Sequence, residues 1–395
     1  MIPNGWKIKK MSDVVIWGSG GTPKATEAAY YENGTIPWLV IGDLNDGVVN
    51  SSASKITELG LKNSSAKLIP PGTLLVAMYG SIGKLGITGI ECCTNQAIAF
   101  AKELHGVTTQ YMFYYMVLIK AKLISMGKGG TQKNISQAVL KSLDVIVPPL
   151  SEQKRIVSRI EELFSQLDAS VAKLKTAKER LKVYRQAVLK EAFSKFDGSI
   201  EKTISSVCEN IVDCPHSTPK SVQKGKLCLR TTNFKPGYLN LSEKNYVSEE
   251  TFCERISRLA PKPGDVLFSR EGAILGIACI IPDGLEVCMG QRMMLLRPSE
   301  DLLNKYLMYY LNSPKARTLI IENVGGTASP HINVGDIKNF TIPIIPFAQQ
   351  QSVVAEIESR LSVCDNIEKT VGTALQQAEA LRQSILKKAF EGEMV

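Results

Sequence analysis

The sequence predicts an α+β fold that occurs twice. A globular domain is followed by one long α-helix, the same pair then repeats, and the two helices pack together as a coiled coil. Three observations predict this fold. Segments of the first half recur, in order, in the second half. Each half opens with short β-branched or aromatic runs between Gly and Pro turns. Each half closes with apolar residues at heptad spacing.

The duplication rests on short matches whose offset stays between 190 and 197 residues. The clearest matches are Thr22-Pro23-Lys24 with Thr218-Pro219-Lys220, Pro71-Gly72 with Pro263-Gly264, Leu85-Gly86-Ile87 with Leu275-Gly276-Ile277, Tyr111-Met112-Phe113-Tyr114-Tyr115 with Tyr306-Leu307-Met308-Tyr309-Tyr310, Gly129-Gly130-Thr131 with Gly325-Gly326-Thr327, and Leu189-Lys190-Glu191-Ala192-Phe193 with Leu386-Lys387-Lys388-Ala389-Phe390. One triplet alone carries little weight. An ordered series at a nearly constant offset indicates a tandem duplication.

The globular parts are assigned to residues 1–150 and 197–346. Runs such as Thr73 to Met78 suit strands, and helical patterns occur near Thr109 to Ser125 and Lys305 to Ile321. Each part is therefore predicted to be an α+β domain.

The long helices are assigned to residues 151–196 and 347–395. After Pro148-Pro149, Ser151 can cap a helix, Glu152 suits its positive end, and no Pro or Gly follows until Gly198. The first helix should therefore extend to about Phe193. The second entry, Ile345-Pro346-Phe347, lacks one proline and the glutamate, so its start is less well defined.

Apolar residues at heptad spacing predict that each helix pairs with the other. The residues expected to form the pairing seam are Ile156, Ile160, Leu163, Leu167, Leu174, Leu181 and Val188 in the first helix, and Val353, Ile357, Ile367, Val371, Leu381 and Ile385 in the second, where Arg360 interrupts the pattern. Residues 151–196 hold 11 basic and 6 acidic side chains, whereas 347–395 hold 5 and 7, which weakly favours a mixed pair. The alternative is that each helix simply packs on its own domain.

Composition narrows the class of protein. The net charge of +9 lies in the first half, where residues 1–196 carry 25 Lys and Arg against 15 Asp and Glu. A basic excess suggests a polyanionic partner. The apolar stretch Tyr111 to Met126 is broken by Lys120 and Lys122, and the N-terminus lacks a signal-peptide core, so we expect a cytoplasmic protein with no membrane partner.

Known catalytic and metal-binding motifs are missing. A chain that itself methylated adenine would carry Asn or Asp followed by Pro-Pro and an aromatic residue. The Pro-Pro pairs of this chain follow Ile69 and Val147, so neither completes that motif. The segment from Gly80 to Leu85 lacks the spacing of a phosphate-binding loop. Cys208, Cys214 and His216 lack a second ligand pair at zinc spacing, so we expect no metal site. These patterns favour a non-catalytic protein.

The whole pattern resembles the specificity subunits of type I restriction-modification systems. The residues that carry the resemblance are Pro3-Asn4-Gly5-Trp6, the helix entry Pro148-Pro149-Leu150-Ser151-Glu152-Gln153, the Gly-Gly-Thr loop from Gly129 toward Ile135, and the Leu-Lys-x-Ala-Phe helix ends. The resemblance spans essentially the whole chain.

The resemblance implies separate roles for the globular domains and the long helices. Each globular part would be a target recognition domain that reads one half of a bipartite site in double-stranded DNA, and the antiparallel helix pair would act as a spacer. The helices would dock two methyltransferase subunits, with restriction subunits as further partners. No cofactor is expected in this chain, because S-adenosylmethionine and ATP would bind the partner subunits.

Candidate DNA-binding residues are Arg, Lys, Asn, Gln, Ser, Thr, Tyr and His side chains in Gly-rich loops or after predicted strands. In the first domain they are Ser19, Lys24, Tyr79, Ser81, Lys84, Lys128, Thr131, Gln132 and Lys133; in the second they are Lys220, Arg230, Asn233, Arg270, Arg292, Thr327, Ser329 and His331. Each also suits an ordinary turn. The sequence places Arg270-Glu271 opposite Gly80-Ser81, an unlike pair that two domains with different targets would show.

Two other classes remain open. The chain could be a different duplicated DNA-binding protein, or a coiled-coil scaffold that binds only protein. DNA binding that requires added methyltransferase subunits would favour the specificity subunit over both.

Overall fold

The computed structural model describes residues 3–129, 133–326 and 330–394. The chain divides into two compact units. Unit 1 contains residues 1–174 and 373–395, and unit 2 contains residues 175–372. Both long helices therefore contribute one stretch to each unit. No helix of the described chain is both long and apolar enough to cross a bilayer.

The elements of the first half are β1 (Lys7–Lys10), α1 (Met11–Val14), β2 (Val15–Ser19), η1 (Ala28–Tyr30), β3 (Ile36–Leu39), η2 (Ile41–Asp43), β4 (Gly47–Val49), β5 (Lys55–Ile56), α2 (Glu58–Lys62), β6 (Leu74–Ala77), β7 (Leu85–Thr88), β8 (Cys93–Thr94), β9 (Ile98–Leu104), α3 (Thr109–Leu118), α4 (Lys120–Ser125), α5 (Gln137–Ser142), β10 (Asp144–Val147) and α6 (Leu150–Ser194).

The elements of the second half are β11 (Glu201–Thr203), α7 (Ile204–Val207), β12 (Cys208–Asp213), β13 (Lys226–Leu229), η3 (Thr231–Asn233), β14 (Phe234–Lys235), β15 (Tyr238–Leu239), β16 (Tyr246–Val247), α8 (Glu249–Ile256), β17 (Val266–Ser269), β18 (Ala278–Ile280), β19 (Cys288–Met289), β20 (Met293–Pro298), α9 (Asn304–Leu311), α10 (Pro314–Glu322), α11 (Val334–Asn339), β21 (Thr341–Pro343) and α12 (Phe347–Phe390).

The two globular domains share one sheet plan. The main sheet has the order β2-β9-β6-β7-β4 in unit 1 and β12-β20-β17-β18 in unit 2. Small sheets of order β5-β3-β8 and β16-β13-β19 recur, as do the pairs β1-β10 and β11-β21. The central strands β6 and β17 are buried along their whole length, as their continuous apolar runs require.

The start of each long helix is anchored by an equivalent glutamine. The Gln153 side chain is fully buried, accepts a hydrogen bond from Thr108 N (3.0 Å) and donates to Pro148 O (2.9 Å). Gln350 is also fully buried and makes the same bonds, accepting from Leu303 N (2.8 Å) and donating to Ile345 O (3.0 Å). The second entry therefore keeps this anchor although its proline and glutamate differ.

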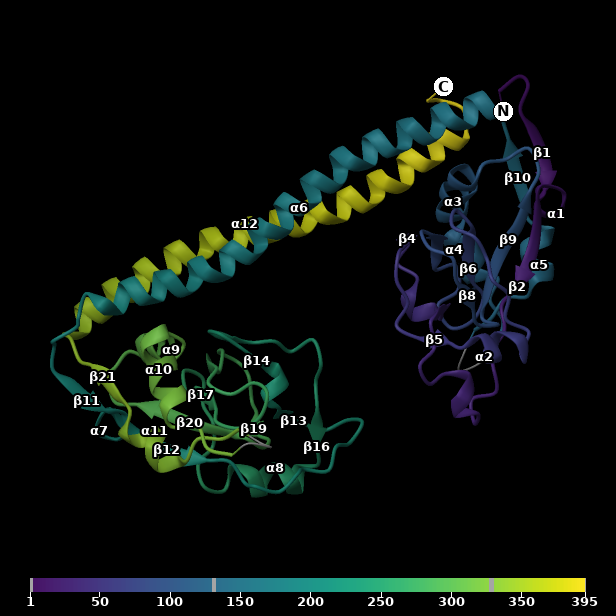
Figure 1. The fold of residues 1–395 in the computed structure, drawn as a ribbon. Coiled ribbons are helices and arrows are strands. Elements are labelled where there is room, and N and C mark those ends of the chain that lie inside the picture. The colour runs from purple at the N-terminus through teal and green to yellow at the C-terminus, as the bar shows by residue number, and fades with distance from the viewer. Residues whose placement is uncertain (1–2, 130–132, 327–329, 395) are drawn as a thin grey trace. The chain divides into compact units, whose positions relative to one another are not determined.

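Within each unit, a stretch of α6 lies beside a stretch of α12, and the contacts run antiparallel (Figure 1). In unit 2, Arg185 donates to Asp365 (2.6 Å) and Glu368 (3.0 Å), and Arg360 donates to Glu191 (2.9 Å). In unit 1, Arg382 donates to Asp168 and stacks over Phe164, with its guanidinium carbon 4.3 Å from the ring centroid.

The residues expected in the helix seam form three groups by exposure. Ile156, Ile160, Val188, Val353, Ile357, Val371 and Ile385 are buried, and Leu163, Leu167, Leu174 and Leu181 are half-buried. Ile367 and Leu381 are 44% and 50% exposed, which corrects their assignment. On α12, the half-buried positions next to the buried series are instead Leu361, Glu368, Leu375 and Arg382.

The C-terminal end of each helix packs into an aromatic cluster. In unit 1, the Phe390 ring lies 5.0 Å from Tyr111 and 5.3 Å from Tyr115. In unit 2, the Phe193 ring lies 5.2 Å from Tyr306 and 5.3 Å from Tyr310. Each helix thus packs on the domain that does not precede it, contrary to the alternative in which a helix packs only on its own domain.

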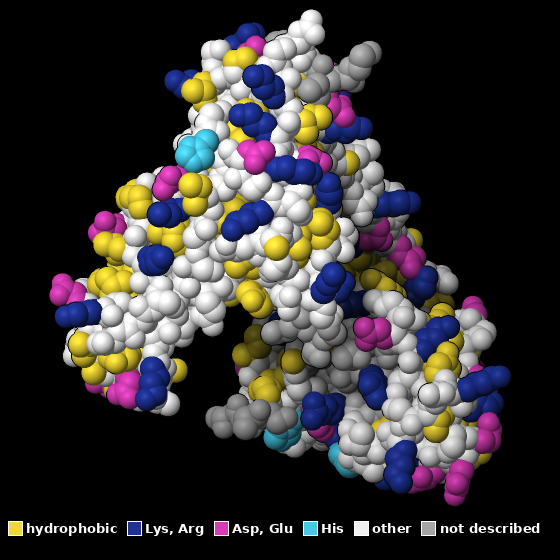
Figure 2. Space-filling model, turned by 90° about the vertical axis from the view of Figure 1, so that its right-hand side faces the viewer, with side chains coloured by type: hydrophobic (Ala, Val, Ile, Leu, Met, Phe, Trp, Pro, Cys, Tyr) yellow, Lys and Arg dark blue, Asp and Glu magenta, His cyan; other side chains and the backbone are white. Residues whose placement is uncertain are grey.

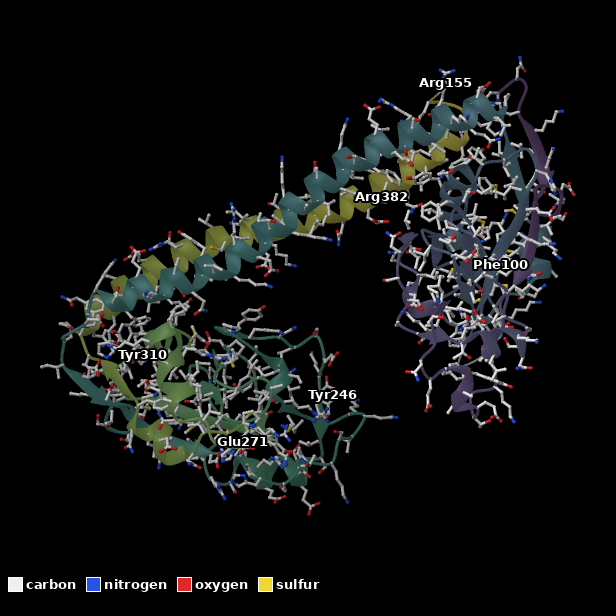
Figure 3. The ribbon with its side chains drawn as sticks, in the orientation of Figure 1. Phe100, Arg155, Tyr246, Glu271, Tyr310 and Arg382 are labelled. Atoms are coloured by element: carbon white, nitrogen blue, oxygen red, sulfur yellow. The ribbon has the colours of Figure 1, made fainter. Side chains whose placement is uncertain are left out.

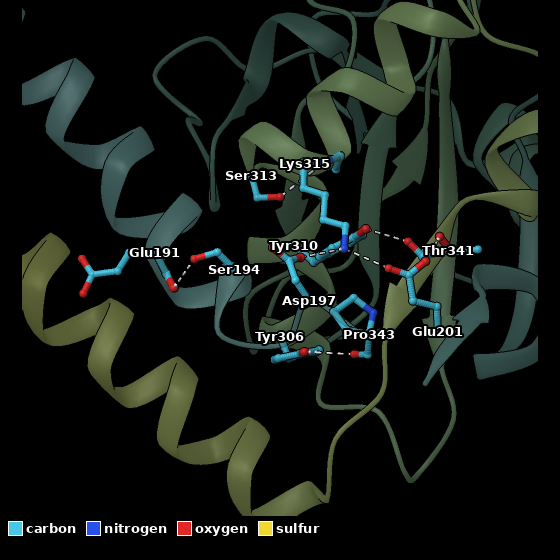
Figure 4. A network of polar contacts seen from close by, with 11 residues as sticks. Glu191, Ser194, Asp197, Glu201, Tyr306, Tyr310, Ser313, Lys315, Thr341 and Pro343 are labelled. Atoms are coloured by element: carbon cyan, nitrogen blue, oxygen red, sulfur yellow. Dashed lines mark hydrogen bonds and ion pairs between the residues drawn. The ribbon is translucent and has the colours of Figure 1, made fainter. Parts of the chain in front are cut away.

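Polar contacts hold the segment that follows α6 in unit 2 against α10 and β21 (Figure 4). Lys315 donates to Glu201 (2.8 Å) and Asp197 (3.2 Å), and Thr341 donates to Glu201 (2.6 Å). The hydrogen bond from Lys315 lowers the pKa of the Glu201 carboxyl, so this link between β11 and α10 is ionised at neutral pH.

Candidate nucleic-acid interface

The candidate site of unit 1 lies at one edge of the main sheet. Ser19 at the end of β2 pairs with Ala99 near the start of β9, and Ala77 at the end of β6 pairs with Ile98. Ser19 and Ser81 are exposed, and Tyr79 is 46% exposed. The strand ends thus bring together residues that lie far apart in the sequence.

The Gly-rich loop joins the same edge. Lys128 and Asn134 exchange backbone hydrogen bonds of 2.9 and 2.8 Å, and Gly80 N donates to Lys133 O (3.1 Å). Lys128 and Lys133 are both exposed. Two more expected residues of this loop, Thr131 and Gln132, lie outside the described residues. The edge therefore presents two cations, a phenol and hydroxyls, a set that suits phosphates and base edges.

Lys24 and Lys84 differ in the exposure of their side chains and in their hydrogen-bond partners. Lys24 is exposed and pairs with Glu27 (3.2 Å), an i,i+3 surface contact of small energy. Lys84 is half-buried and donates to Ile41 O (3.1 Å) and Gly42 O (3.3 Å). Lys84 therefore holds the segment before β7 against η2, whereas Lys24 remains a candidate for DNA contact.

The candidate site of unit 2 occupies the equivalent edge. Arg292 is exposed immediately before β20 and adopts φ +66°, a left-handed conformation rare outside Gly and Asn. His331 exchanges backbone hydrogen bonds with Gly325 (2.9 and 3.0 Å) and bridges Glu271. Thr327 and Ser329 lie outside the described residues. Figure 3 labels Glu271 on this edge and Tyr310 in the core beneath the end of α6.

Lys220 and Arg230 are both exposed. The Arg230 guanidinium donates to Ser221 Oγ (3.0 Å). Thr218 contacts Gln291 (3.1 Å), which ties the loop before Lys220 to the turn that carries Arg292. Thr22 contacts Gln96 in the same way in unit 1. These Gln residues were not expected from sequence, because a single polar residue in a turn carries no pattern.

Asn233 and Arg270 are buried, which contradicts the expectation that they reach DNA directly. Asn233 is 5% exposed, and its side chain donates to Asn240 O (3.0 Å) and Glu243 O (2.9 Å). The side chain of Arg270 is 6% exposed. Its guanidinium forms two bonds to Asp213 (2.8 and 3.0 Å) and pairs with Glu271 (2.7 Å).

Strand register also corrects the expected match between the domains. Tyr79 bridges Asn134, and Glu271 bridges His331. Ile135 N donates to Met78 O, and Ile332 N donates to Arg270 O. Arg270-Glu271 therefore corresponds to Met78-Tyr79 rather than to Gly80-Ser81. The two domains still differ here, because a buried methionine in one is a buried ion pair in the other.

No group of three or more His, Cys, Asp or Glu side chains in the described residues is arranged to hold a metal ion. Burial raises the pKa of the Cys208 thiol to about 12 and also raises that of Cys214. Protonated thiols are poor metal ligands. His216 Nε2 lies 3.2 Å from Asp213, at the rim of the Arg270 ion pair.

Charge on the surface is mixed. On the face drawn in Figure 2, Lys and Arg side chains are interspersed with Asp and Glu rather than gathered into one basic area. The cations of the candidate sites are named residues at the sheet edges, such as Lys128, Lys133 and Arg292.

Comparison with known proteins assigns the family. The model of the "type I restriction modification DNA specificity domain" matches residues 3–179 and 211–377. The chain belongs to the type I restriction-modification specificity subunits. The resemblance drawn from the sequence is thereby confirmed, and the chain carries two tandem DNA specificity domains.

Relatives match over the whole chain. The EcoKI specificity subunit of Escherichia coli K12 is 25% identical over 100% of this chain and 90% of its own length. The StySPI specificity subunit of Salmonella potsdam is 23% identical over 100% and 90%. Specificity subunits are the non-catalytic DNA-recognition components of these systems, and this chain is one of them.

Solved structures share the fold. A chain from a study of complex assembly and conformational transition of the type I R-M system superposes with a TM-score of 0.76 at 20% identity, covering 99% of this chain and 98% of that chain. The HsdS subunit from Thermoanaerobacter tengcongensis gives 0.54 at 20% identity, covering 99% and 98%.

Proposed function

We propose that this specificity subunit selects a bipartite target in double-stranded DNA. Each globular domain reads one half-site with the sheet edge described above. The helices α6 and α12 pair as an antiparallel coiled coil that sets the distance between the half-sites. The same helices dock two methyltransferase subunits, and restriction subunits in a restriction complex.

One observation carries this proposal: the same edge is built in both units with different side chains. The backbone frame repeats, as the paired bridges of Tyr79 and Glu271 illustrate. Exposed groups differ, because Lys128 and Lys133 in unit 1 correspond to no lysine in unit 2. A shared frame suits a common way of holding DNA, and different side chains suit different base sequences.

The spacer role is supported by helix length and by the cross-helix contacts. α6 has 45 residues, which at about 1.5 Å per residue gives a length of about 68 Å. Half-sites on successive turns of duplex are about 34 Å apart. A rod of this length therefore suits a separation of one to two turns.

The partner subunits are proposed to carry out the chemistry on the target base. S-adenosylmethionine would bind the methyltransferase subunits and ATP the restriction subunits. The residues of this chain would contribute binding and orientation: they hold each half-site so that a partner can extrude the target adenine.

The direct test is sequencing of adenine methylation in cells with and without this gene. We expect one bipartite motif to lose methylation when the gene is absent and to regain it on complementation. An unchanged methylome, with the partner methyltransferase expressed, would contradict the proposal.

A further inference from the structure

Each unit has a cleft between its long helices and its globular domain, and the two clefts differ in charge. The cleft of unit 2 has a volume of about 280 Å³ and is lined by residues that include Lys182, Arg185, Pro236, Tyr309 and Leu361. The cleft of unit 1 has a volume of about 670 Å³ and is lined in part by Tyr114, Phe164, Glu379 and Arg382.

The two clefts are built from equivalent residues. A shift of 197 residues relates Arg185 to Arg382 and Leu361 to Phe164, and Tyr309 corresponds to Tyr114 through the repeated Tyr-rich segment. The same shift places Lys182 opposite Glu379, so the charge is reversed at that position. Asp46, Glu161 and Asp168 add further acids to the unit 1 cleft. The two clefts thus have equivalent residues at several lining positions but differ in the charge of their linings.

Lys182 belongs to a cationic stripe on α6. Lys175, Lys178 and Lys182 are spaced i, i+3 and i+7, which puts them on one flank of the helix. All three are exposed. The equivalent positions of α12 are Gly372, Leu375 and Glu379, so the second helix carries no such stripe.

In the described residues, carboxylates near the stripe pair with only one of its three lysines, Lys182. Asp365 and Glu368 are bound by Arg185, and Glu179 pairs with Lys182 (2.9 Å) on the exposed surface of one helix. Exposed pairs of that last kind contribute little free energy, so Glu179 holds Lys182 only weakly. In the described part of the chain, Lys175 and Lys178 form no ion pair.

The stripe leads toward the recognition domain. Pro236, in the turn between β14 and β15, lines the same cleft as Lys182. On either side of this turn, Lys235 is exposed and Tyr238 is 60% exposed. Arg230, a candidate DNA contact, lies five residues before Lys235 on the same segment. The cleft therefore has Lys182 of α6 in its lining, and Lys235 of the recognition domain stands next in sequence to the lining residue Pro236.

We propose that Lys175, Lys178 and Lys182 bind the phosphate backbone of DNA beside the second half-site. The contact is independent of base sequence, and it makes one end of the spacer helix part of the DNA-binding surface. This inference rests on the proposed bipartite DNA recognition. An anionic polymer matches a row of lysines about one helical turn apart, since lysine ammonium groups bind phosphate as point charges.

The test uses the subunit reconstituted with its methyltransferase partners. The triple variant Lys175→Gln, Lys178→Gln and Lys182→Gln is compared with a control of equal charge change, Arg155→Gln, Lys173→Gln and Arg180→Gln. The control residues are exposed on the opposite flank of α6. Affinity for a duplex carrying the methylated motif's sequence is measured from 50 to 200 mM salt.

We expect the slope of log K against log salt to become less steep by about 2.7 in the stripe variant, about 0.9 for each lost phosphate contact. Over that salt range the variant would lose about 40-fold less affinity than the wild type, while the control keeps the wild-type slope. The methylated motif should not change. An unchanged slope in the stripe variant would overturn the inference.

A second measurement separates DNA from an acidic protein partner. Association of the stripe variant with methyltransferase subunits, measured without DNA, should equal that of the wild type. Weaker association there, with an unchanged salt slope on DNA, would assign the stripe to a protein face and overturn the inference. Failure of the wild-type complex to prefer its motif would instead refute the proposed function, and this inference with it.

Discussion

Replacing Phe390 by alanine should destabilise unit 1 although Phe390 lies near the end of the chain. The residue is 1% exposed, and its ring contacts Tyr111 and Tyr115. Truncating a buried phenylalanine to alanine costs about 3 to 5 kcal/mol. For a unit of about 200 residues, each kcal/mol lowers Tm by about 2 to 4 °C, so we expect a fall of about 6 to 20 °C.

The assay must report on unit 1 separately, because two units need not unfold together. Hydrogen exchange of α3 (Thr109–Leu118), followed by mass spectrometry during heating, gives that resolution. The control is Leu381→Ala on the same helix, which is 50% exposed and should change stability by less than about 0.5 kcal/mol. If Phe390→Ala costs less than about 1 kcal/mol, or leaves exchange of α3 unchanged, the described packing of α12 on the first domain is wrong.

Three further predictions concern the second unit and the spacer. Arg270→Met should destabilise unit 2 by about 3 kcal/mol, because it removes the buried cation that pairs with Asp213 and Glu271. Urea unfolding measures this loss, and a value under about 1 kcal/mol would refute a structural role for Arg270. Glu191→Lys should lower the free energy of unfolding because the new lysine repels Arg360, and adding Arg360→Glu should restore part of the loss. A double-mutant cycle that shows no coupling energy between the two positions would contradict this contact. Removing about one heptad from both helices should shorten the tolerated spacer while both half-sites stay the same, as methylation sequencing would show. An unchanged spacer would refute the proposal that the helix pair sets the distance between the half-sites.

The fold could be predicted from the sequence where a pattern repeats. Ordered matches such as Tyr111 to Tyr115 with Tyr306 to Tyr310 indicated the duplication, and uninterrupted helical sequence after Pro149 indicated α6. These signals are periodic or duplicated, so they need no knowledge of tertiary contacts.

The helix seam was predicted only in part. The buried series of α12, from Ile357 to Ile385, is apolar and was identified. The adjoining row contains Glu368 and Arg382, which pair across the helices, so apolar spacing pointed one position away, to Ile367 and Leu381. Charged residues that are half-buried by pairing are invisible to a hydrophobic pattern.

The candidate site was predicted at the level of loops rather than of side chains. Arg270 reads as a surface cation because its partner Asp213 lies 57 residues away in the sequence. Asn233 reads as a turn residue because the carbonyls it bonds are contributed by a later turn. Sequence offers no signal for the Arg270 contact, since it forms only when the sheet brings distant strands together, and none for the Asn233 contacts, since a turn residue shows no pattern that tells a buried side chain from an exposed one.

The central claim is that each domain reads its own half of a split target. Exchanging the first recognition domain for that of a relative with a different target, while keeping residues 150–395, tests it most directly. Sequencing of adenine methylation should then show a new first half-site, with the second half-site and the spacer unchanged. A change in both halves of the motif, with methylation still efficient, would contradict the account.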